Sequence, residues 1–220
     1  NYKDYAHIGS GNFNESTAKS YTDMSLLTCN PDITDEVRRV FDLMEGNFTP
    51  YNYKHLLVSP INMRTRLVRL INTEIRNAKA GKVAYIYLKV NNLIDPDIIV
   101  ELYQASKEGV EIKLNVRGIC GVKSGLKRIS ENIESISILG AFLEHNRVFI
   151  FGNNGEPKTF IGSADIMERN LDRRIEITTP IYDLDLQKEI RDIFDLQWKD
   201  NVKARILDSQ SLNKYVDGGK

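Results

Sequence analysis

Short apolar runs alternate with helical segments between residues 55 and 116, and this alternation restricts the possible folds more than any other feature. Three of the runs are predicted strands: His55–Ser59, Val83–Val90 and Val110–Val116. The two segments between them carry apolar residues at helical spacing, and the predicted start of each is a capping residue followed by proline, Ser59-Pro60 and Asp95-Pro96. A strand–helix–strand–helix–strand order requires right-handed crossovers and predicts a parallel sheet core. We therefore expect an α/β fold with a mixed, largely parallel sheet flanked by helices.

Similar signals predict further elements on both sides of this region. Thr34 is expected to cap a helix that Gly46 ends, and Asp183 is expected to open the last helix. Further strands are predicted at Ser135–Leu139, Val148–Phe151, Thr159–Ile161 and Arg174–Thr179. The best candidate boundary is Asn47–Asn52, which contains Pro50. We expect residues 1–50 to be the tail of one domain and residues 51–220 to be a whole second domain.

Composition argues against several classes of protein. Lys and Arg total 30, as do Asp and Glu, so no net charge attracts a polyanion and no nucleic-acid partner is expected. The cysteines, Cys29 and Cys120, have neither disulfide nor zinc-site spacing and fit small buried thiols in a reducing compartment. No apolar run approaches the ~20 residues of a membrane helix. We therefore expect a cytoplasmic protein without a transmembrane segment; a peripheral position at the inner membrane surface is compatible with this.

A weak internal repeat carries the most information about function. Gly9-Ser10-Gly11-Asn12 and Gly162-Ser163-Ala164-Asp165 lie 153 residues apart, and the same offset pairs Asp23 with Glu176 and Tyr21 with Arg174. Glycine lets a backbone approach a phosphate, and serine with Asn or Asp supplies short polar groups around it. The repeat therefore predicts two phosphate-binding turns. The two acids are expected to orient a histidine or an arginine rather than to act as bases.

A histidine motif precedes the second copy of the repeat. His145-Asn146-Arg147 lies seventeen residues before Gly162 and leads into a predicted strand. It resembles the phospholipase-D-like superfamily, whose pattern is H-x-K, four residues, D, and then G-S-x-N. Here Arg147 replaces the lysine and Gly152 stands where the aspartate would be, which argues against a simple phosphodiesterase. By the same spacing, the H-x-K of the first half would fall before residue 1.

An arginine and a tyrosine are candidates for binding phosphate and nucleotide. Arg117 ends the strand Val110–Val116 at the carboxyl edge, where open α/β sheets bind ligands, and its guanidinium can hold two phosphate oxygens. A surface arginine beside a glycine turn explains it equally well. Tyr21 can stack on an adenine ring, although packing is the usual role of a tyrosine at a strand start. Arg174 pairs with Tyr21 in the repeat and is preferred over Arg173, for which a salt bridge is expected.

His145 is the candidate catalytic residue. An imidazole that titrates near neutrality can donate a proton or hold a phosphate oxygen, whereas the alternative is an ordinary core or surface histidine. We interpret His7 and His55 as structural, and Asn12 as a phosphate-binding group of the first turn. A basic stretch beside Arg117 either guides a phosphate-rich substrate or is a solvated loop: Lys123, Lys127 and Arg128.

Several separate blocks resemble the carboxy-terminal region of bacterial polyphosphate kinase, in order and over essentially the whole chain. They are Tyr5–Glu15, Tyr21–Asp23 with Leu26–Thr28, Asn115–Cys120, Ser130–Ile133, Phe142–His145, Gly162–Asp165 and Arg169–Arg174. Small departures occur at Ser10, where the family often has Thr, and at Ile166, where it often has Trp. The resemblance implies a phospholipase-D-like fold, with residues 1–50 as the end of a first catalytic domain that is truncated upstream and residues 51–220 as the second.

The resemblance also implies an activity. The terminal phosphoryl group of ATP would move reversibly to a histidine upstream of this fragment and then to polyphosphate, so the fragment is expected to be inactive alone. Tyr21, Arg117 and His145 match family positions associated with ATP binding. ATP, ADP and inorganic polyphosphate are the implied ligands, Mg²⁺ is expected with ligands upstream of residue 1, and a homo-oligomer is expected.

Two other functions are compatible with the sequence. A phospholipase-D-like phosphodiesterase or nuclease would hydrolyse diesters, and Arg147 and Gly152 argue against it. A non-catalytic interaction module would bind no nucleotide and would tolerate loss of His145. The polar motif residues gathered at strand ends argue against that reading.

Overall fold

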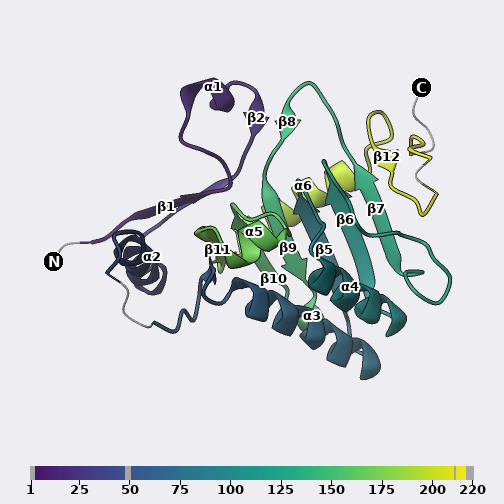
Figure 1. The fold of residues 1–220 in the computed structure, drawn as a ribbon, viewed down its shortest axis with the longest axis horizontal. Helices are drawn as coiled ribbons and strands as arrows, with labels where there is room; N and C mark the ends of the chain where they lie inside the picture. The colour runs from purple at the N-terminus through teal and green to yellow at the C-terminus, as the bar shows by residue number, and fades with distance from the viewer. Residues whose placement is uncertain (1–2, 48–50, 211, 217–220) are drawn as a thin grey trace.

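A mixed eight-stranded sheet forms the centre of the molecule (Figure 1). The computed structural model describes residues 3–47, 51–210 and 212–216. The strand order is β12–β7–β6–β5–β9–β10–β11–β4. The strands are β4 (Leu57–Ser59), β5 (Tyr85–Val90), β6 (Glu111–Val116), β7 (Ile133–Ser137), β9 (Arg147–Phe151), β10 (Lys158–Gly162), β11 (Glu176–Ile181) and β12 (Arg205–Ile206).

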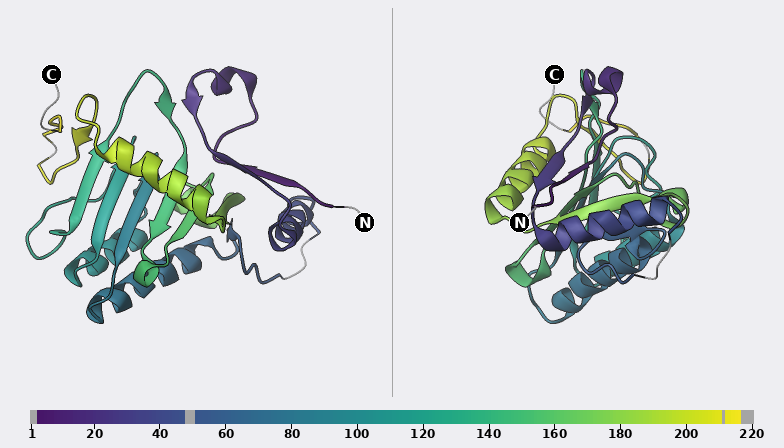
Figure 2. Two further views of the ribbon diagram at one scale, coloured as in Figure 1. Left: turned by 180° about the vertical axis from the view of Figure 1, so that it is seen from behind. Right: turned by 90° about the vertical axis from the view of Figure 1, so that its left-hand side faces the viewer.

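Helices cover both faces of this sheet. On one face lie α3 (Met63–Lys79), α4 (Pro96–Lys107) and α5 (Glu168–Asp172), and on the other lies α6 (Leu184–Trp198). Figure 2 shows α6 crossing the sheet in front, with α3 and α4 behind it. Alternate residues of the central strands face the two cores: Phe149 and Phe151 pack against the α3–α4 side, whereas Val148 and Ile150 pack against α6. The prediction of a mixed sheet flanked by helices is confirmed.

Parallel pairing within this sheet is confined to β5, β6 and β7 in the described part of the chain. The expectation that the mixed sheet is largely parallel is wrong, because its five other described strand pairings are antiparallel. The first predicted strand is among them, since β4 pairs antiparallel with β11 at the far edge of the sheet. Strands β9, β10 and β11 pair antiparallel and separate β4 from β5. A crossover fixes the direction of a strand but not how many later strands are inserted beside it, so order along the chain could not reveal this insertion.

The first residues form a small unit beside the edge of the sheet. It contains β1 (Ala6–Gly9), α1 (Glu15–Ala18), β2 (Tyr21–Thr22), β3 (Ser25–Thr28) and α2 (Pro31–Met44). β1 and β3 form an antiparallel pair, whereas β2 pairs in parallel with β8 (Leu143–Glu144), more than a hundred residues later. The segment just before residue 145 therefore lies beside the first residues of the chain (Figure 1).

A buried carboxylate joins this unit to the edge of the large sheet. Glu36 of α2 is 1% exposed and accepts hydrogen bonds from the backbone N–H groups of Lys54, at 2.5 Å, His55, at 3.1 Å, and Leu56, at 2.7 Å. Side chains from both segments share a core around this contact: Ile8, Ile33, Val40, Tyr53, Leu56 and Val58. The expected boundary at Asn47–Asn52 lies partly outside the described residues, which omit 48–50.

Two helices begin at other residues than expected. Asn30 caps α2, because its side chain accepts the backbone N–H of Asp32 and Pro31 occupies the first turn, so the expected cap at Thr34 is wrong. α3 begins at Met63, after Asn62 rather than Ser59. The Asn62 side chain folds back to the preceding strand, where it accepts the N–H of Val58 at 2.7 Å. By contrast, the predicted caps of α4 and α6 are confirmed.

Arg64 binds two acids from different helices. It donates to Asp95 at 2.6 and 2.8 Å and to Asp172 at 2.5 and 2.8 Å, and so connects α3 with the cap of α4 and the end of α5. The hydrogen bonds with Asp172 and Asp95 raise the pKa of Arg64. Asp95 is 1% exposed, so its buried negative charge needs the neighbouring charge of Arg64.

Loss of Arg64 is therefore expected to destabilise the fold. Arg64→Met should lower the free energy of unfolding by about 2 kcal/mol, less than for a fully buried pair because the arginine is partly solvated. Denaturant unfolding monitored by circular dichroism measures this change. Arg38→Met, which removes an exposed pair with Asp4, is the control and should lower it by less than about 1 kcal/mol. Equal losses of unfolding free energy for Arg64→Met and Arg38→Met would contradict the stabilising role assigned to Arg64.

The two cysteines are less buried than the sequence suggested. Cys29 and Cys120 are free and half-buried, and burial raises the pKa of the Cys120 thiol. None of the helices in residues 3–47, 51–210 and 212–216 has both the length and the apolar character needed to cross a bilayer.

Candidate functional site

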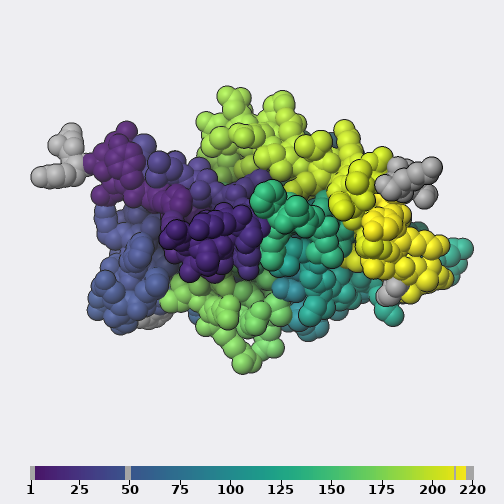
Figure 3. Space-filling view, turned by 90° about the horizontal axis from the view of Figure 1, so that it is seen from above, coloured from purple at the N-terminus to yellow at the C-terminus, as the bar shows by residue number. Residues whose placement is uncertain are grey.

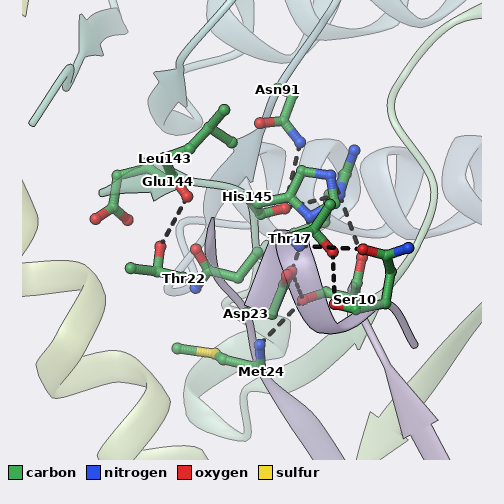
Figure 4. Close-up of polar contacts among 12 residues, drawn as sticks. Ser10, Thr17, Thr22, Asp23, Met24, Asn91, Leu143, Glu144 and His145 are labelled. Atoms are coloured by element: carbon green, nitrogen blue, oxygen red, sulfur yellow. Dashed lines mark hydrogen bonds and ion pairs between the residues drawn. The ribbon is translucent and has the colours of Figure 1, made fainter. Parts of the chain in front are cut away.

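The polar residues of the two halves meet where β8 leads into β9, next to the carboxyl end of β5 (Figure 4). The pairing of β2 with β8 brings Tyr21 beside Leu143 and Thr22 beside Glu144. Seen from above, the purple beginning of the chain lies against the green segment that includes β8 (Figure 3). The site is therefore built from residues more than a hundred positions apart in sequence.

His145 is held on both ring nitrogens. Its Nδ1 lies 2.9 Å from Oδ1 of Asp23, and its Nε2 lies 3.0 Å from a terminal nitrogen of Arg147. Because an arginine can only donate, Nε2 accepts from Arg147, so Nδ1 carries the hydrogen and donates to Asp23. The Tyr21 ring packs against the imidazole, with ring centroids 4.9 Å apart. Asp23 thus orients a histidine, as its place in the repeat predicted.

The internal repeat appears as one hydrogen-bonding pattern made twice. The Ser10 hydroxyl donates to Asp23 at 2.7 Å and accepts the N–H of Met24 at 3.0 Å. In the second copy the Ser163 hydroxyl donates to Glu176 and accepts the N–H of Ile177 at 3.4 Å. The offset of 153 residues therefore reflects equivalent structure in the two turns.

The glycines of the two turns are required by packing within the protein. A Cβ atom on Gly11 would lie 2.1 Å from the Asp23 carboxylate, and one on Gly162 would lie 2.3 Å from the Thr178 hydroxyl oxygen. Both distances are far below van der Waals contact. These glycines let protein groups approach closely, and contact of the turns with phosphate stays a prediction.

The departures from the phospholipase-D-like pattern have structural causes. Arg147 donates to the buried carboxylate of Asp165, with its Nε at 3.2 Å. Burial raises the pKa of Asp165, but the charge of Arg147 and hydrogen bonds from Arg147, Asn92 and Asn91 outweigh it and hold that pKa below its usual value. At Gly152 a Cβ atom would lie 2.7 Å from the Tyr85 ring, so an aspartate does not fit there.

Arg117 is connected to His145 through one asparagine. Its Nε donates to the Asn91 side-chain oxygen at 2.6 Å, and the Asn91 amide nitrogen donates to the carbonyl oxygen of His145 at 3.2 Å. Arg117 directly follows β6 and is half-buried, as the sequence predicted. Within the described residues its terminal nitrogens make no hydrogen bond, so both can face an anion.

Asn12 and Arg174 are placed differently from the other candidates. Both are exposed, and among the described residues neither hydrogen-bonds to Tyr21, Arg117 or His145. Arg174 lies before β11, which begins at Glu176, so the predicted strand Arg174–Thr179 starts two residues too early. A binding role for Asn12 and Arg174 stays a prediction.

The remaining basic residues named in the sequence analysis lie outside the site around His145. Arg173 pairs with Glu168 at 2.5 Å, which agrees with the expected salt bridge. His7 packs edge-on against Phe13, and His55 Nδ1 lies 2.5 Å from the Tyr182 hydroxyl. The basic stretch is exposed: Lys123, Lys127 and Arg128.

Two residues of this network were not singled out from the sequence. Lys89 and Asn91 are 3% and 1% exposed and lie at the carboxyl end of β5. Burial lowers the pKa of Lys89, although its hydrogen bond with Glu144 acts in the opposite direction. The available signal was a lysine and an asparagine at alternate positions of an otherwise apolar run, which places both on one face of the strand.

Comparison with known proteins gives consistent results. The family model described as polyphosphate kinase C-terminal domain 1 matches residues 1–50, and that of polyphosphate kinase C-terminal domain 2 matches residues 56–220. A polyphosphate kinase of Vibrio cholerae is 52% identical over 215 residues, which cover 98% of this chain and 31% of that protein. The chain thus spans about a third of the length of the curated relatives it matches.

Solved structures extend the comparison to the fold. A crystal structure of polyphosphate kinase from Porphyromonas gingivalis superposes with a TM-score of 0.94 at 42% identity, covering 99% of this chain and 34% of that one. Nuc, a phospholipase D family member from Salmonella typhimurium, superposes with a TM-score of 0.52 at 17% identity, covering 70% of this chain and 97% of that one. At that identity Nuc shows the fold alone, and the predicted phospholipase-D-like fold is confirmed.

Proposed function

This chain belongs to the polyphosphate kinase family, and on that premise we propose that it is the carboxy-terminal part of an ATP:polyphosphate phosphotransferase. The enzyme would move the terminal phosphoryl group of ATP reversibly onto polyphosphate through a phosphohistidine upstream of residue 1. The observation that carries the proposal is His145, oriented by Asp23, packed against Tyr21 and linked to Arg117 through Asn91.

These side chains suit phosphoryl transfer. The reaction needs positioning and positive charge against the transferred group more than it needs covalent chemistry beyond the nucleophile. We propose that Arg117 binds phosphate oxygens with its terminal nitrogens and that Tyr21 contacts the adenine ring. His145 would face the upstream nucleophile, and it would hold or protonate an ATP phosphate oxygen through Nε2 once that nitrogen carries a proton and has given up its hydrogen bond from Arg147.

We propose that the nucleophile lies beside the second copy of the repeat. Asp23 belongs to the first turn and orients the histidine that precedes the second turn. By the same relation, Glu176 of the second turn would orient the histidine that precedes the first turn. Glu176 already accepts hydrogen bonds from Ser163 and, at 2.7 Å, from Asn170, which fixes the direction of its carboxylate.

Several features of the whole enzyme belong to the same proposal. We propose residues 1–50 as the end of a first phospholipase-D-like domain and residues 51–220 as the second, in a cytoplasmic homo-oligomer that binds ATP, ADP and inorganic polyphosphate. Mg²⁺ would accompany the nucleotide. The described residues contain no cluster of three or more His, Cys, Asp or Glu suited to a metal ion, so its ligands are proposed upstream and no step is assigned to it.

Labelled ATP tests the proposal. The full-length polypeptide incubated with magnesium and ATP labelled on the γ-phosphate should gain label that is stable to alkali and labile to acid, as phosphohistidine is. Added polyphosphate should then chase the label into a soluble polyanion. A folded protein that binds magnesium-ATP but gains no label would overturn the phosphohistidine mechanism, and hydrolysis of phosphodiesters would be assayed next.

A further inference from the structure

A buried lysine contacts both neighbours of His145 in the sequence. Lys89 Nζ donates to the Glu144 carboxylate at 2.5 Å and to the side-chain oxygen of Asn146. Lys89 is 3% exposed, so solvent cannot replace these partners. The ammonium group therefore holds the two residues on either side of His145.

The same strand contacts the His145 segment a second time. Two residues after Lys89, the Asn91 amide donates to the His145 carbonyl oxygen. The backbone N–H groups of His145 and Asn146 are bound to the carbonyl oxygen of Thr22, at 3.1 and 3.0 Å. The main chain around His145 is thus fixed from β5 on one side and from β2 on the other.

Helix α6, which covers the face of the sheet to which Tyr87 and Lys89 point, also takes part. Glu144 accepts a second hydrogen bond, at 2.9 Å, from the amide of Gln197 in α6. The Glu144 carboxylate is therefore shared between the buried lysine and a helix that packs on the sheet. A small movement of Lys89 would be transmitted directly to the backbone that carries the imidazole.

Stability alone does not explain this lysine. Burying an ammonium group is unfavourable, and well-packed apolar residues often replace a buried ion pair without loss of stability. A lysine at this position makes better sense where the position of its acceptors matters. Lys89 does not contact the imidazole itself, so its effect must pass through Glu144 and Asn146.

We propose that Lys89 is a positioning residue that fixes the place and direction of the His145 ring for phosphoryl transfer, acting through Glu144 and Asn146. This inference rests on the proposed function of the same site. It adds a residue that no sequence motif contains, and it assigns the reason why a charged side chain is buried at the end of β5.

Kinetics of the full-length enzyme test the role. Lys89→Met keeps the length of the side chain and removes its hydrogen bonds, and it should lower kcat for polyphosphate synthesis by about 10- to 100-fold, as expected for a displaced catalytic group. The KM for ATP should change by less than about threefold, because the binding contacts of Tyr21 and Arg117 remain. A kcat equal to that of the wild type would overturn the proposal.

Lys113 offers a matched control. It is a partly buried lysine on the neighbouring strand β6 and pairs with Glu111 at 2.9 Å and with the Tyr87 hydroxyl, not with the His145 segment. Lys113→Met makes the same chemical change in the same sheet and should leave kcat within about twofold of the wild type. An equal loss in both variants would mean that any lysine removed from this sheet impairs the enzyme, and would contradict the proposal.

A double-mutant cycle separates positioning from a general loss of stability. If Lys89 acts through His145, adding Lys89→Met to His145→Ala should change the residual rate by less than about threefold. A further drop as large as in the wild-type background would overturn the proposal. If Lys89→Met does not fold, as judged by circular dichroism, Asn146→Ala replaces it in the same cycle with the same two outcomes.

The same assays separate failure of this inference from failure of the proposed function. Wild-type protein that neither gains label from ATP nor makes polyphosphate would refute the function itself. Wild-type protein that does both, with Lys89 variants that behave like it, would refute only the positioning role.

Discussion

Replacing His145 with alanine is expected to lower kcat for polyphosphate synthesis by about 1,000-fold, within the range found when a general acid or base is removed. The reason is geometric, since Asp23 and Arg147 leave the ring a single tautomer and a single orientation. Full-length His145→Ala should be compared with the wild type by measuring kcat and KM for ATP separately. The KM is expected to change by less than about tenfold, because Tyr21 and Arg117 stay in place.

His55 provides the control for this substitution. Like His145, it packs against a tyrosine ring, that of Tyr182, but among the described parts of the chain it has no hydrogen bond with the site residues. His55→Ala should therefore leave kcat within about twofold of the wild type. A His145→Ala enzyme with normal kcat and a greatly raised KM would show that His145 only binds ATP, and normal values of both would favour the non-catalytic interpretation.

Replacing Asp165 with asparagine is expected to lower the free energy of unfolding by about 3 kcal/mol at neutral pH. Asp165 is 5% exposed and accepts hydrogen bonds from Asn91, Asn92 and Arg147. An asparagine can keep one or two of these bonds, but it leaves the guanidinium of Arg147 buried without its counter-charge. Chemical denaturation of the wild type and the variant measures the difference, with the two curves fitted to the same m value, the slope of unfolding free energy against denaturant concentration.

The effect of Asp165→Asn depends on pH in a defined direction. The folded state holds the pKa of Asp165 below its usual value, so the carboxylate contributes its full stabilisation above the unfolded pKa of about 3.9. That contribution is lost as the pH falls through the lower folded pKa. The difference in free energy of unfolding between the wild type and Asp165→Asn should therefore be the same at pH 7 and pH 5. It should become smaller only in stronger acid.

An exposed ion pair serves as the comparison for Asp165. Glu168→Gln removes the pair with Arg173 and should lower the free energy of unfolding by less than about 1 kcal/mol. A loss of that small size for Asp165→Asn as well would mean that Arg147 finds other acceptors. The carbonyl oxygens of Ser10 and His145, which it already contacts, are the nearest ones.

Local signals in the sequence predicted most elements, and the errors have physical causes. Asp95 and Asp183 cap their helices as expected, because each is followed at once by a helical segment. Asn30 was missed because Thr34, one turn later, fits the same signal. The place of β4 could not be predicted, since it depends on antiparallel strands that come a hundred residues later.

Part of the candidate site could be predicted from the internal repeat. Asp23, one of its two acids, was expected to orient a histidine or an arginine, and the structure places its carboxylate beside His145. The contacts of Lys89 were not readable, because a lysine in a strand gives no indication of which residues, 55 and 57 positions later, will accept its hydrogen bonds. Arg174 was preferred because the repeat pairs it with Tyr21, in a strand that was predicted to begin at Arg174 but begins at Glu176.

The hydrogen bonds between the Glu36 carboxylate and the backbone of Lys54, His55 and Leu56 affect how the protein unfolds. We expect these three amides to exchange with solvent mainly when α2 leaves the edge of the sheet, because a buried carboxylate accepts their hydrogen bonds. Detachment of α2 also exposes the core shared by Ile33 and Leu56. We therefore expect fraying of the sheet at β4 and release of the first residues to be one cooperative event, although the two segments match separate family models.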